Sequence, residues 1–597
     1  MLAERDSSGV TAAFGVARSF TSRTWTLRGG DSETARGFAR DHSISATLAQ
    51  ILVARGIADA EIADTLYPTL KKMLPEPLSL KDMDKAVARA RQAIENGEKI
   101  AVFGDYDVDG SSSAALMSEF LTALGKPPRI YIPDRMTEGY GPNAPAMRKL
   151  KDEGASLVIT VDCGAGAVAA LTAARDAGLD VVVLDHHAVE IPPPAFAHVN
   201  PNQPGDTSGL TYVCAAGVTF LFLVALNRAL RDAGWYGANG IAEPKLMDSL
   251  DLVGLATVCD VVPLIGVNRA FVRAGLGKLS TLSRPGFAQL AAVAKSEPPF
   301  TPYSLGFLFG PRINAGGRVG RCSLGVELLT AKTSAEALPL AQMLDRHNKE
   351  RQALEGIILE SAVALAAQQD NAPFILVGEE GWHPGVVGIV ASRLKDRFGK
   401  PALVAGFEGG MGRGSARSVQ GIDIGAAVRA AYEAGILETG GGHAMAAGFS
   451  LTAGKLDAFR EFLAAQFAKG DGALTAAQTL DVDVLISPSG ATVSLLEEIA
   501  LAGPYGAGNE EPLVAVADAR IAFADIVGKD HVRVRLVGAD GGRLDAISFR
   551  TATTPLGQGL LGARGKRVHA VGKLRKDEWN GQVRVQLHLE DAAAAEV

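Results

Sequence analysis

Short apolar runs alternate with amphipathic stretches through the first half of the chain. Residues 100–103, 157–161 and 181–184 are continuous apolar runs of the length of a buried strand, and helical spacing fills the intervals between them. This alternation is typical of βαβ units around a parallel sheet that is covered on both faces. The pattern therefore predicts an α/β domain with a buried parallel sheet.

Two further patterns follow in the second half of the chain. Residues 334–370 keep the apolar spacing of one long helix, which we expect to be a rigid connector between two domains. Residues 374–405 repeat the strand–helix–strand alternation. Beyond residue 471, β-branched and alternating segments are separated by turns at residues 540–541 and 580–581, which predicts a small closed barrel of the OB type.

The chain has 597 residues, too many for one hydrophobic core, so we expect several domains. The patterns predict an α/β multidomain protein. Its parts in chain order are a flexible N-terminal extension rich in Ser, Arg, Thr and Gly (residues 1–40), a helical lead-in (41–98), the first α/β domain (99–325), the connector helix (326–370), a second α/β domain (371–470) and the barrel (471–597).

Composition narrows the class of protein. Hydrophobic residues make up 47% and charged residues 21%, as in globular proteins. The four cysteines form no CxxC pair, which argues against a disulfide framework and a structural zinc site. The longest apolar run, residues 213–226, is too short to cross a bilayer, and the N-terminus lacks a signal-peptide pattern. We therefore expect a cytoplasmic protein that contacts no membrane. We also expect it to be a monomer. The net charge of −7 means that any nucleic acid must bind through a local basic groove.

Three carboxylates follow the first predicted strand. Asp105, Asp107 and Asp109 are alternate residues of a turn, and alternate side chains face the same way, so they can converge on a hard cation. An EF-hand loop begins with the same D-x-D-x-D-G pattern, but it requires Glu at its twelfth position, which is Leu116 here. A strand rather than a helix also precedes this turn. The remaining alternative is an acidic turn that is merely solvated.

The other predicted strands also end in polar residues. Asp162 follows the second strand, and Asp260 follows a further apolar run, residues 252–259, which we also expect to be a strand. Ligands of open α/β sheets bind at the carboxyl ends of the strands. A lone His-His pair is usually structural, but four coincidences at one sheet edge favour a shared site. The third strand ends in one acid and two imidazoles: Asp185, His186 and His187.

The ligand types indicate the metal. Oxygen ligands with one or two imidazoles and no thiolate favour Mn²⁺ or Mg²⁺ over zinc–thiolate and iron–sulfur sites. Several carboxylates in one site repel one another strongly without cations. Two ions would neutralise them and would support in-line attack on phosphorus.

The motifs also resemble a known family. FGDYDVDG, VDCG, LDHH and ATVCDVVPL, in this order, resemble the DHH phosphoesterase superfamily. IPDRMTEGYG, PRINAGGR, GWHPGVVGIVASRL, GSARS and GGHAMAAGF resemble the RecJ exonucleases within it. The match runs from about residue 41 to the C-terminus and implies a parallel-sheet DHH domain, a long connector helix, an α/β DHHA1 domain and a C-terminal OB-type barrel. Two departures, Cys259 before Asp260 and Gly316 in place of a common Ala, remove no ligand.

The resemblance implies roles for individual residues. The implied metal ligands are Asp107, Asp109, Asp162, His186 and Asp260, with Asp105 as a further ligand or a support for one. His187 is implied to contact the scissile phosphate. The expected catalytic set is therefore Asp107, Asp109, Asp162, His186, His187 and Asp260.

A second set of residues is expected to bind the substrate: Arg135, Arg312, Arg318, Ser415, Arg417 and His443. The first three lie in motifs with Gly or Pro, and a guanidinium suits phosphate oxygens. Each of the three is alternatively a surface arginine paired with a carboxylate. Ser415 and Arg417 resemble the family's terminal-phosphate contacts, which would set the polarity of attack. His443 follows three glycines. These glycines either let the backbone approach a phosphate closely or have only a capping role.

The function implied is that of a 5′-to-3′ exonuclease specific for single-stranded DNA, which uses two-metal-ion catalysis in DNA repair and recombination. A helicase and a single-strand-binding protein are the expected partners. One alternative is a phosphodiesterase or pyrophosphatase for small substrates, although those relatives are shorter and would not need the barrel. The other alternative is a DNA-binding scaffold without activity, which the complete set of ligands argues against.

Overall fold

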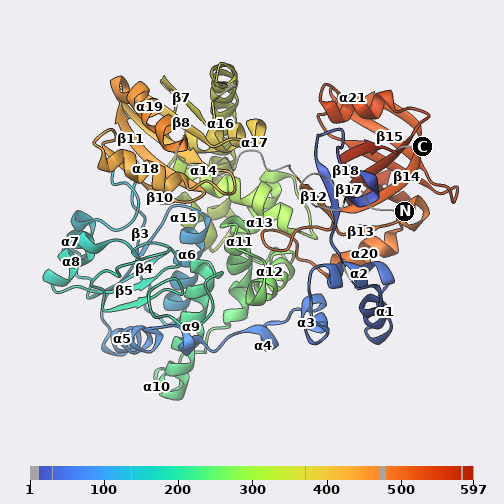
Figure 1. Cartoon of the computed structure of the whole chain (residues 1–597). Coiled ribbons are helices and arrows are strands. Elements are labelled where there is room, and N and C mark those ends of the chain that lie inside the picture. The colour runs from blue at the N-terminus through green and yellow to red at the C-terminus, as the bar shows by residue number, and fades with distance from the viewer. Residues whose placement is uncertain are drawn as a thin grey trace. The chain divides into compact units, whose positions relative to one another are not determined.

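The computed structural model of the chain describes residues 12–29, 31–135, 137–369, 372–468, 479–579 and 582–595 (Figure 1). The chain divides into two compact units. The unit that carries both α/β patterns comprises Pro75–Val262 and Ala274–Ala476. The unit that carries the barrel comprises Met1–Leu74, Pro263–Arg273 and Ala477–Val597.

The first α/β domain is built on a five-stranded parallel sheet with the order β3-β2-β4-β5-β6. Its elements are α5 (Met83–Asn96), β2 (Ile100–Gly104), α6 (Val108–Ala123), β3 (Arg129–Tyr131), α7 (Ala144–Asp152), β4 (Leu157–Val161), α8 (Val168–Asp176), β5 (Asp180–Leu184), β6 (Ala197–Val199) and α9 (Ala215–Asp232). Helices α7 and α8 pack on one face through Met147, Leu150 and Leu171, and α6 and α9 pack on the other (Figure 1). The predicted buried parallel sheet is confirmed.

The fourth apolar run corrects one prediction. Residues 252–259 belong to a helix, α11 (Leu250–Cys259), rather than to a strand. The helix packs against α6 and α9 and is buried from Leu250 to Thr257. A helix that is buried on every side has no polar face, so its periodicity cannot be distinguished from that of a buried strand. The other helices between α9 and the long helix are α10 (Trp235–Asn239), the 3₁₀-helix η4 (Leu246–Ser249), α12 (Gly266–Leu279), α13 (Pro285–Ala294), the π-helix η5 (Ser304–Phe309), α14 (Gly310–Val319) and α15 (Leu324–Thr330).

The long helix is present as α16 (Ser334–Ala367), which begins at an N-cap formed by Thr333. Its first half packs against α13 and α14, and its second half packs against elements of the second α/β domain. Its buried face includes Arg351, which donates hydrogen bonds to the buried side chains of Asn348 and Glu355. Ile357, which belongs to the apolar spacing of residues 334–370 and is expected on the same stripe of the helix, is 69% exposed. Apolar spacing thus located the helix, but it missed a partly polar buried face.

The second α/β domain has a mixed sheet with the order β10-β11-β9-β8-β7. Its elements are β7 (Ile375–Glu380), α17 (Val387–Phe398), β8 (Ala402–Glu408), β9 (Met411–Arg417), α18 (Ile424–Glu433), β10 (Thr439–His443), β11 (Ala446–Thr452) and α19 (Leu456–Phe467). Strands β7 and β8 are parallel, and the other neighbours are antiparallel. Helix α17 covers one face together with α16, and α18 and α19 cover the other.

The C-terminal part of the other unit is the predicted barrel. Its elements are β13 (Val484–Leu485), α20 (Val493–Leu501), β14 (Val514–Val527), β15 (His531–Val537), β16 (Arg543–Ser548), α21 (Pro555–Gly562), β17 (Arg567–Trp579) and β18 (Gln582–Ala594). Strand β14 pairs with β15 and also with β17, which closes the ring β14-β15-β16-β18-β17. Gly541 makes the predicted β15–β16 turn with a φ of +76°. The predicted turn at residues 580–581 lies outside the described residues.

The expected flexible extension is wrong for residues 12–29 and 31–40. Strand β1 (Thr24–Leu27) pairs in parallel with β12 (Thr479–Val482), and α1 (Ser32–Asp41) follows it. Trp25 is fully buried, and its indole N–H donates a 2.9 Å hydrogen bond to Asp591 of β18. One large aromatic residue anchors a segment whose composition otherwise resembles that of a disordered tail.

The predicted helical lead-in contains α2 (Ala46–Ala54), α3 (Ile62–Leu66), α4 (Leu70–Met73) and α5, and it is divided between the two units. The apolar run at residues 213–226 forms most of α9, a buried helix as expected. Among the described helices, none combines the length and the hydropathy that crossing a bilayer requires.

Candidate metal centre and arginine cavity

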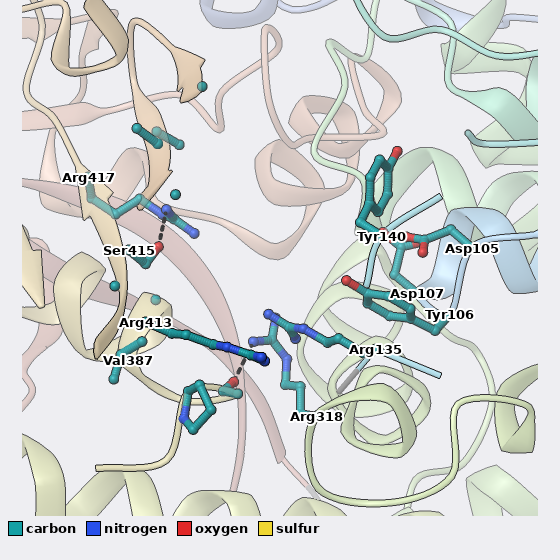
Figure 2. A pocket seen from close by; sticks show the side chains of 18 residues that line it. Asp105, Tyr106, Asp107, Arg135, Tyr140, Arg318, Val387, Arg413, Ser415 and Arg417 are labelled. Carbon is teal, nitrogen blue, oxygen red and sulfur yellow. Dashed lines mark hydrogen bonds between the residues drawn. The ribbon is translucent and has the colours of Figure 1, made fainter. Parts of the chain in front are cut away.

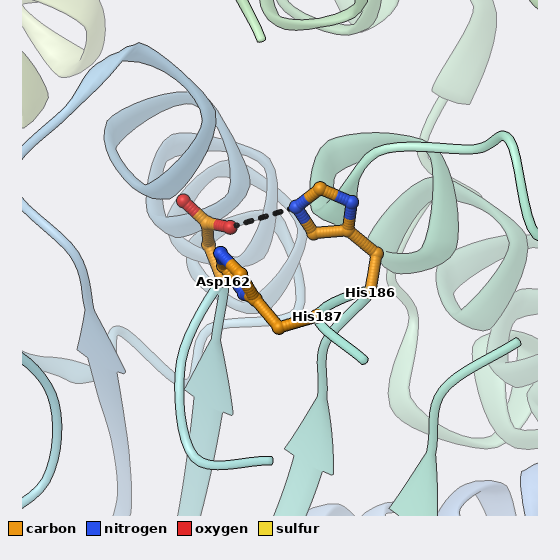
Figure 3. A group of neighbouring side chains, drawn as sticks. All are labelled: Asp162, His186 and His187. Carbon is orange, nitrogen blue, oxygen red and sulfur yellow. Dashed lines mark ion pairs between the residues drawn. The ribbon is translucent and has the colours of Figure 1, made fainter. Parts of the chain in front are cut away.

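Six predicted ligands meet at the carboxyl edge of the parallel sheet. Their donor atoms form overlapping groups that could hold cations, one made by Asp105, Asp107 and Asp162 and another by Asp109, His186 and Asp260. The side chains come from the turn after β2, the first turn of α6, the ends of β4 and β5, and the C-cap of α11. Asp162 joins the groups, because it also lies with His186 and His187 in a third one (Figure 3).

His186 lies at the centre of the cluster. Its Nε2 atom is 3.5 Å from Oδ1 of Asp162, 3.5 Å from Oδ2 of Asp260 and 3.8 Å from Oδ2 of Asp109. Within the described part of the chain, the buried atoms Oδ1 of Asp105, Oδ1 of Asp162, Oδ2 of Asp260 and Nε2 of His186 have no hydrogen-bond partner. Buried polar atoms almost always have partners. A set of converging oxygen and imidazole atoms without them fits Mn²⁺ or Mg²⁺.

Backbone N–H groups fix two of the carboxylates. Asp107 is the N-cap of α6 and accepts a 3.0 Å hydrogen bond from the N–H of Gly110. Asp109 accepts from the N–H groups of Ala215 and Ala216 at 2.7 and 2.8 Å, at the first residues of α9. The positive end of a helix dipole stabilises a carboxylate there. Both side chains therefore have fixed orientations toward the cluster.

Asp185 organises the loop after β5. It accepts hydrogen bonds from the backbone of Ala165, His186 and His187 and from Nδ1 of His187 at 2.7 Å. The side-chain amides of Asn200 and Asn202 donate to the carbonyls of His187 and His186. Sequence reasoning noted Asp185 only as part of a strand end. Its role as an acceptor could have been anticipated from the need of a metal-site imidazole for a fixed orientation.

The pKa values of four carboxylates of the cluster are raised, as expected for buried acids that lie close together. Burial and the neighbouring Asp107 raise the pKa of Asp109 to about 7. Burial and the charge of Asp109 raise the pKa of Asp260 to about 9, and burial raises the pKa values of Asp105 and Asp162 well above normal. Carboxylates packed this closely share protons unless a cation replaces them.

The two histidines differ in charge. Burial and the nearby His187 lower the pKa of His186 to about 4, so its ring is neutral and suited to bind a metal. Burial opposes charge on His187 as well, but the hydrogen bond to Asp185 raises the pKa of His187 to about 9. Burial of Asp185 is outweighed by the same bond, which lowers the pKa of Asp185 to about 2. His187 is therefore an imidazolium at neutral pH.

A cavity of about 530 Å³ adjoins the cluster, with Asp105 and Asp107 in its wall (Figure 2). Arg318 from α14 and Arg413 from β9 extend into it, together with Arg135 from the loop after β3, and their guanidinium ends point toward one another (Figure 2). The remaining polar wall includes Tyr106, Tyr140, Ser415 and Arg417. The four arginines give this cavity a local positive charge on a chain whose net charge is −7.

Two arginines of the cavity donate to neutral oxygen atoms. Arg318 donates to the carbonyl of Gly385 at 3.0 Å, and burial and the nearby Arg135 lower the pKa of Arg318 to about 10. Arg417 donates to Oγ of Ser415 at 2.9 Å, as Figure 2 shows. Guanidinium groups gathered at this density attract phosphate oxygens.

The structure separates the predicted substrate residues into two groups. Arg135, Arg318, Ser415 and Arg417 line the cavity. Arg312 instead forms an ion pair with Asp345 at 2.9 Å and donates to the carbonyl of Leu308, so it braces α14 against α16. This is the carboxylate-paired alternative that its sequence left open.

His443 is exposed at the end of β10, and the neighbouring Gly442 rather than His443 lines the cavity. Arg413 was missed from the sequence. It belongs to the same RGSARS segment as Ser415 and Arg417, and the alternation of side chains along a strand could have indicated that all three share one face.

Comparison with known proteins identifies relatives over most of the chain. Residues 99–255 match the DHH family, N-terminal domain, residues 370–469 match the DHHA1 domain, and residues 482–591 match the RecJ OB domain. The single-stranded-DNA-specific exonuclease RecJ of Bacillus subtilis (strain 168) is 34% identical over 96% of this chain and 71% of that protein.

Solved structures agree with the sequence comparison. The crystal structure of RecJ in complex with Mn²⁺ from Thermus thermophilus matches with a TM-score of 0.78 at 29% identity, over 95% of this chain and 78% of that one. The crystal structure of the same protein in complex with Mg²⁺ matches with a TM-score of 0.72 at 28% identity, over 95% of this chain and 77% of that one.

Proposed function

This chain belongs to the RecJ family of single-stranded-DNA-specific exonucleases, and we propose that it removes nucleotides from the 5′ end of single-stranded DNA with two bound Mn²⁺ or Mg²⁺ ions. The observation that carries the proposal is the junction of a carboxylate–imidazole cluster with an arginine-lined cavity. Asp105, Asp107, Asp109, Asp162, His186 and Asp260 would hold the ions. Such ions activate water and neutralise the charge that develops on the phosphoryl group in the transition state.

The side chains of the protein position the substrate. His187, held by Asp185, presents a protonated ring beside the cluster and would contact an oxygen of the scissile phosphate. Arg135, Arg318 and Arg413 would bind phosphates next to it. Ser415 and Arg417 would grip a terminal 5′-phosphate, and this contact sets the direction of degradation. The exposed His443, at the edge of β10, would contact the strand outside the cavity.

The wider setting follows from this activity. We propose a cytoplasmic monomer that acts in DNA repair and recombination, beside a helicase that unwinds duplex DNA and a single-strand-binding protein that keeps the strand open. An enzyme that degrades unpaired strands needs such partners whenever its substrate begins as duplex.

The proposal is tested with internally labelled single-stranded and duplex DNA, each blocked at the 5′ or the 3′ end, in Mn²⁺ or Mg²⁺. We expect degradation of single strands with a free 5′ end and none when that end is blocked. Asp109→Asn keeps the size of the buried side chain and should abolish activity. Asp176→Asn changes an exposed carboxylate of α8 and should not.

Three other results would contradict the proposal in different ways. Hydrolysis of dinucleotides or pyrophosphate alone would place the protein among phosphodiesterases of small substrates. Tight binding of single strands without hydrolysis would make it a scaffold. Degradation that requires a free 3′ end would leave the metal chemistry intact and refute the assigned polarity.

A further inference from the structure

Two aromatic side chains are exposed on η5, the turn that precedes α14, and have no role in the proposed hydrolysis. Tyr303 is 62% exposed and Phe307 is 68% exposed. Their rings stack on each other, with centroids 5.0 Å apart and planes inclined by 19°. Because each ring covers part of one face of the other, the apolar surface that the pair exposes consists of the outer ring faces and the ring edges.

The surface rests on a rigid base. Tyr303 is the N-cap of η5 and Phe307 lies within it. The opposite side of η5 buries Leu305 and Phe309, and Phe309 packs against Phe300 with ring centroids 5.2 Å apart. A π-helical turn is uncommon and occurs frequently at functional sites. The buried side chains of Leu305 and Phe309 therefore fix the turn that carries the two exposed rings.

The same turn is joined to the metal cluster. Cys259, the last residue of α11, donates from Sγ to the carbonyl of Leu305 at 3.4 Å. A Cβ on Gly310 would lie 2.5 Å from that sulfur atom, so η5 and α11 are in close contact. Asp260 follows Cys259 directly and provides a ligand oxygen of the second metal group. The turn that carries the aromatic pair thus contacts α11 at the end of the helix that precedes Asp260.

The arginine cavity lies near the end of α14 that is farther from η5. It is lined by Asp105 and Asp107 and by Arg318, which stands near the end of α14, whereas η5 leads into the beginning of that helix. Ten residues of α-helix span roughly 15 Å. A strand whose 5′ end occupies the cavity and whose scissile phosphate lies at the cluster would therefore continue toward Tyr303 and Phe307.

We propose that Tyr303 and Phe307 form a stacking platform for unpaired bases on the 3′ side of the scissile bond. This inference rests on the proposed function and adds a site for the part of the strand not yet degraded. Stacking on aromatic rings tolerates every base, because each base has a π-face, and it is available only to bases freed from a duplex. The platform would thus hold single strands in register without reading their sequence.

The test compares steady-state kinetics of the wild type and of Tyr303→Ala/Phe307→Ala on long single strands and on a dinucleotide. For the long strand we expect KM to rise about 10-fold, with kcat unchanged within about twofold. Hydrolysis of the dinucleotide, which is too short to reach the platform, should not change. Phe307→Leu keeps an apolar side chain but should weaken binding, and Phe307→Trp should restore it. Ile357→Ala, at an equally exposed apolar residue of α16, should behave as the wild type.

Abasic substrates distinguish stacking of bases on the two rings from other contacts between the strand and these side chains. A series of strands is prepared, each of which lacks the base of a single nucleotide among the first several from the 5′ end. We expect at least one position where its loss raises the KM of the wild type but not that of the double variant. An unchanged KM in the double variant would overturn the proposal, and so would an equal penalty for lost bases in both proteins. The first of these results would also be expected if the rings bound a partner protein instead.

The same variants distinguish failure of this inference from failure of the proposed function. If the wild type degrades DNA and the double variant matches it, only the platform is refuted. If the wild type degrades no strand, the proposed function fails. The platform is then judged by fluorescence anisotropy with 5′-phosphorylated oligothymidylate in EDTA, where equal affinity of wild type and double variant would refute it.

Discussion

Asp185 lies outside the metal groups but hydrogen-bonds to the backbone and the ring of residues within them. Its carboxylate accepts from three backbone N–H groups and from the ring of His187. Asp185→Asn would remove the charge that keeps His187 protonated and would replace an acceptor oxygen with a donor. We expect kcat to fall by about 10- to 100-fold, as is usual when such supporting residues are changed. Asp176→Asn serves as the control, and an unchanged kcat would contradict this role.

Arg413 and Arg312 form a second comparison at the residue scale. Arg413 extends into the cavity, whereas Arg312 is paired with Asp345. Arg413→Ala should raise KM by about 10-fold for single strands with a 5′-phosphate, because a phosphate contact between charged groups is lost. Arg312→Ala should leave KM unchanged and lower the midpoint of thermal unfolding. Kinetics and calorimetry on both variants check these two roles. A higher KM in Arg312→Ala together with a lower unfolding midpoint in Arg413→Ala would contradict them.

At the scale of elements, the β2–α6 junction determines where two ligands lie. A Cβ on Gly110 would approach the carbonyl oxygen of Asp105 to 2.6 Å, so the turn and the helix can meet this closely only at a glycine. Gly110→Ala should displace Asp105 and Asp107 from the cluster and lower kcat by about 100-fold. Gly356→Ala, in an open part of α16, is the matched control. Equal activity of the two variants would show that the junction tolerates movement.

Much of this site was predictable from the sequence, because apolar runs followed by carboxylates locate strand ends. The strands before Asp105, Asp162 and Asp185 are where the pattern placed them. The element before Asp260 is a helix instead, since α11 is buried on all sides and carries no periodic signal. Arg312 could not be distinguished from Arg318, because its pairing with Asp345 joins residues of two different helices. The aromatic pair was missed because exposure is a property of the fold.

At the scale of the whole molecule, the N-terminal segment is part of the barrel unit. Trp25 is fully buried on β1 and bonded to Asp591. Trp25→Ala should lower the free energy of unfolding of that unit by about 3–5 kcal/mol through loss of buried area and a cavity. Calorimetry should show this loss, while hydrolysis of a dinucleotide stays unchanged. Leu27→Ala, at an exposed position of the same strand, should have little effect. A Trp25→Ala protein as stable as the wild type would contradict the claim that the N-terminal segment stabilises the barrel unit.

The central claim is that the cluster of Asp and His residues binds the ions on which hydrolysis depends. Calorimetric titration of the metal-free protein with Mn²⁺, in two buffers that differ in ionisation enthalpy, tests this claim directly. We predict two ions per chain and a release of protons at pH 7, because the pKa of Asp260 is raised to about 9 and that of Asp109 to about 7 without metal. Affinity should therefore weaken as the pH falls, and activity should appear as the ions bind. Binding that survives unchanged in Asp260→Asn, or activity that persists in EDTA, would contradict the account.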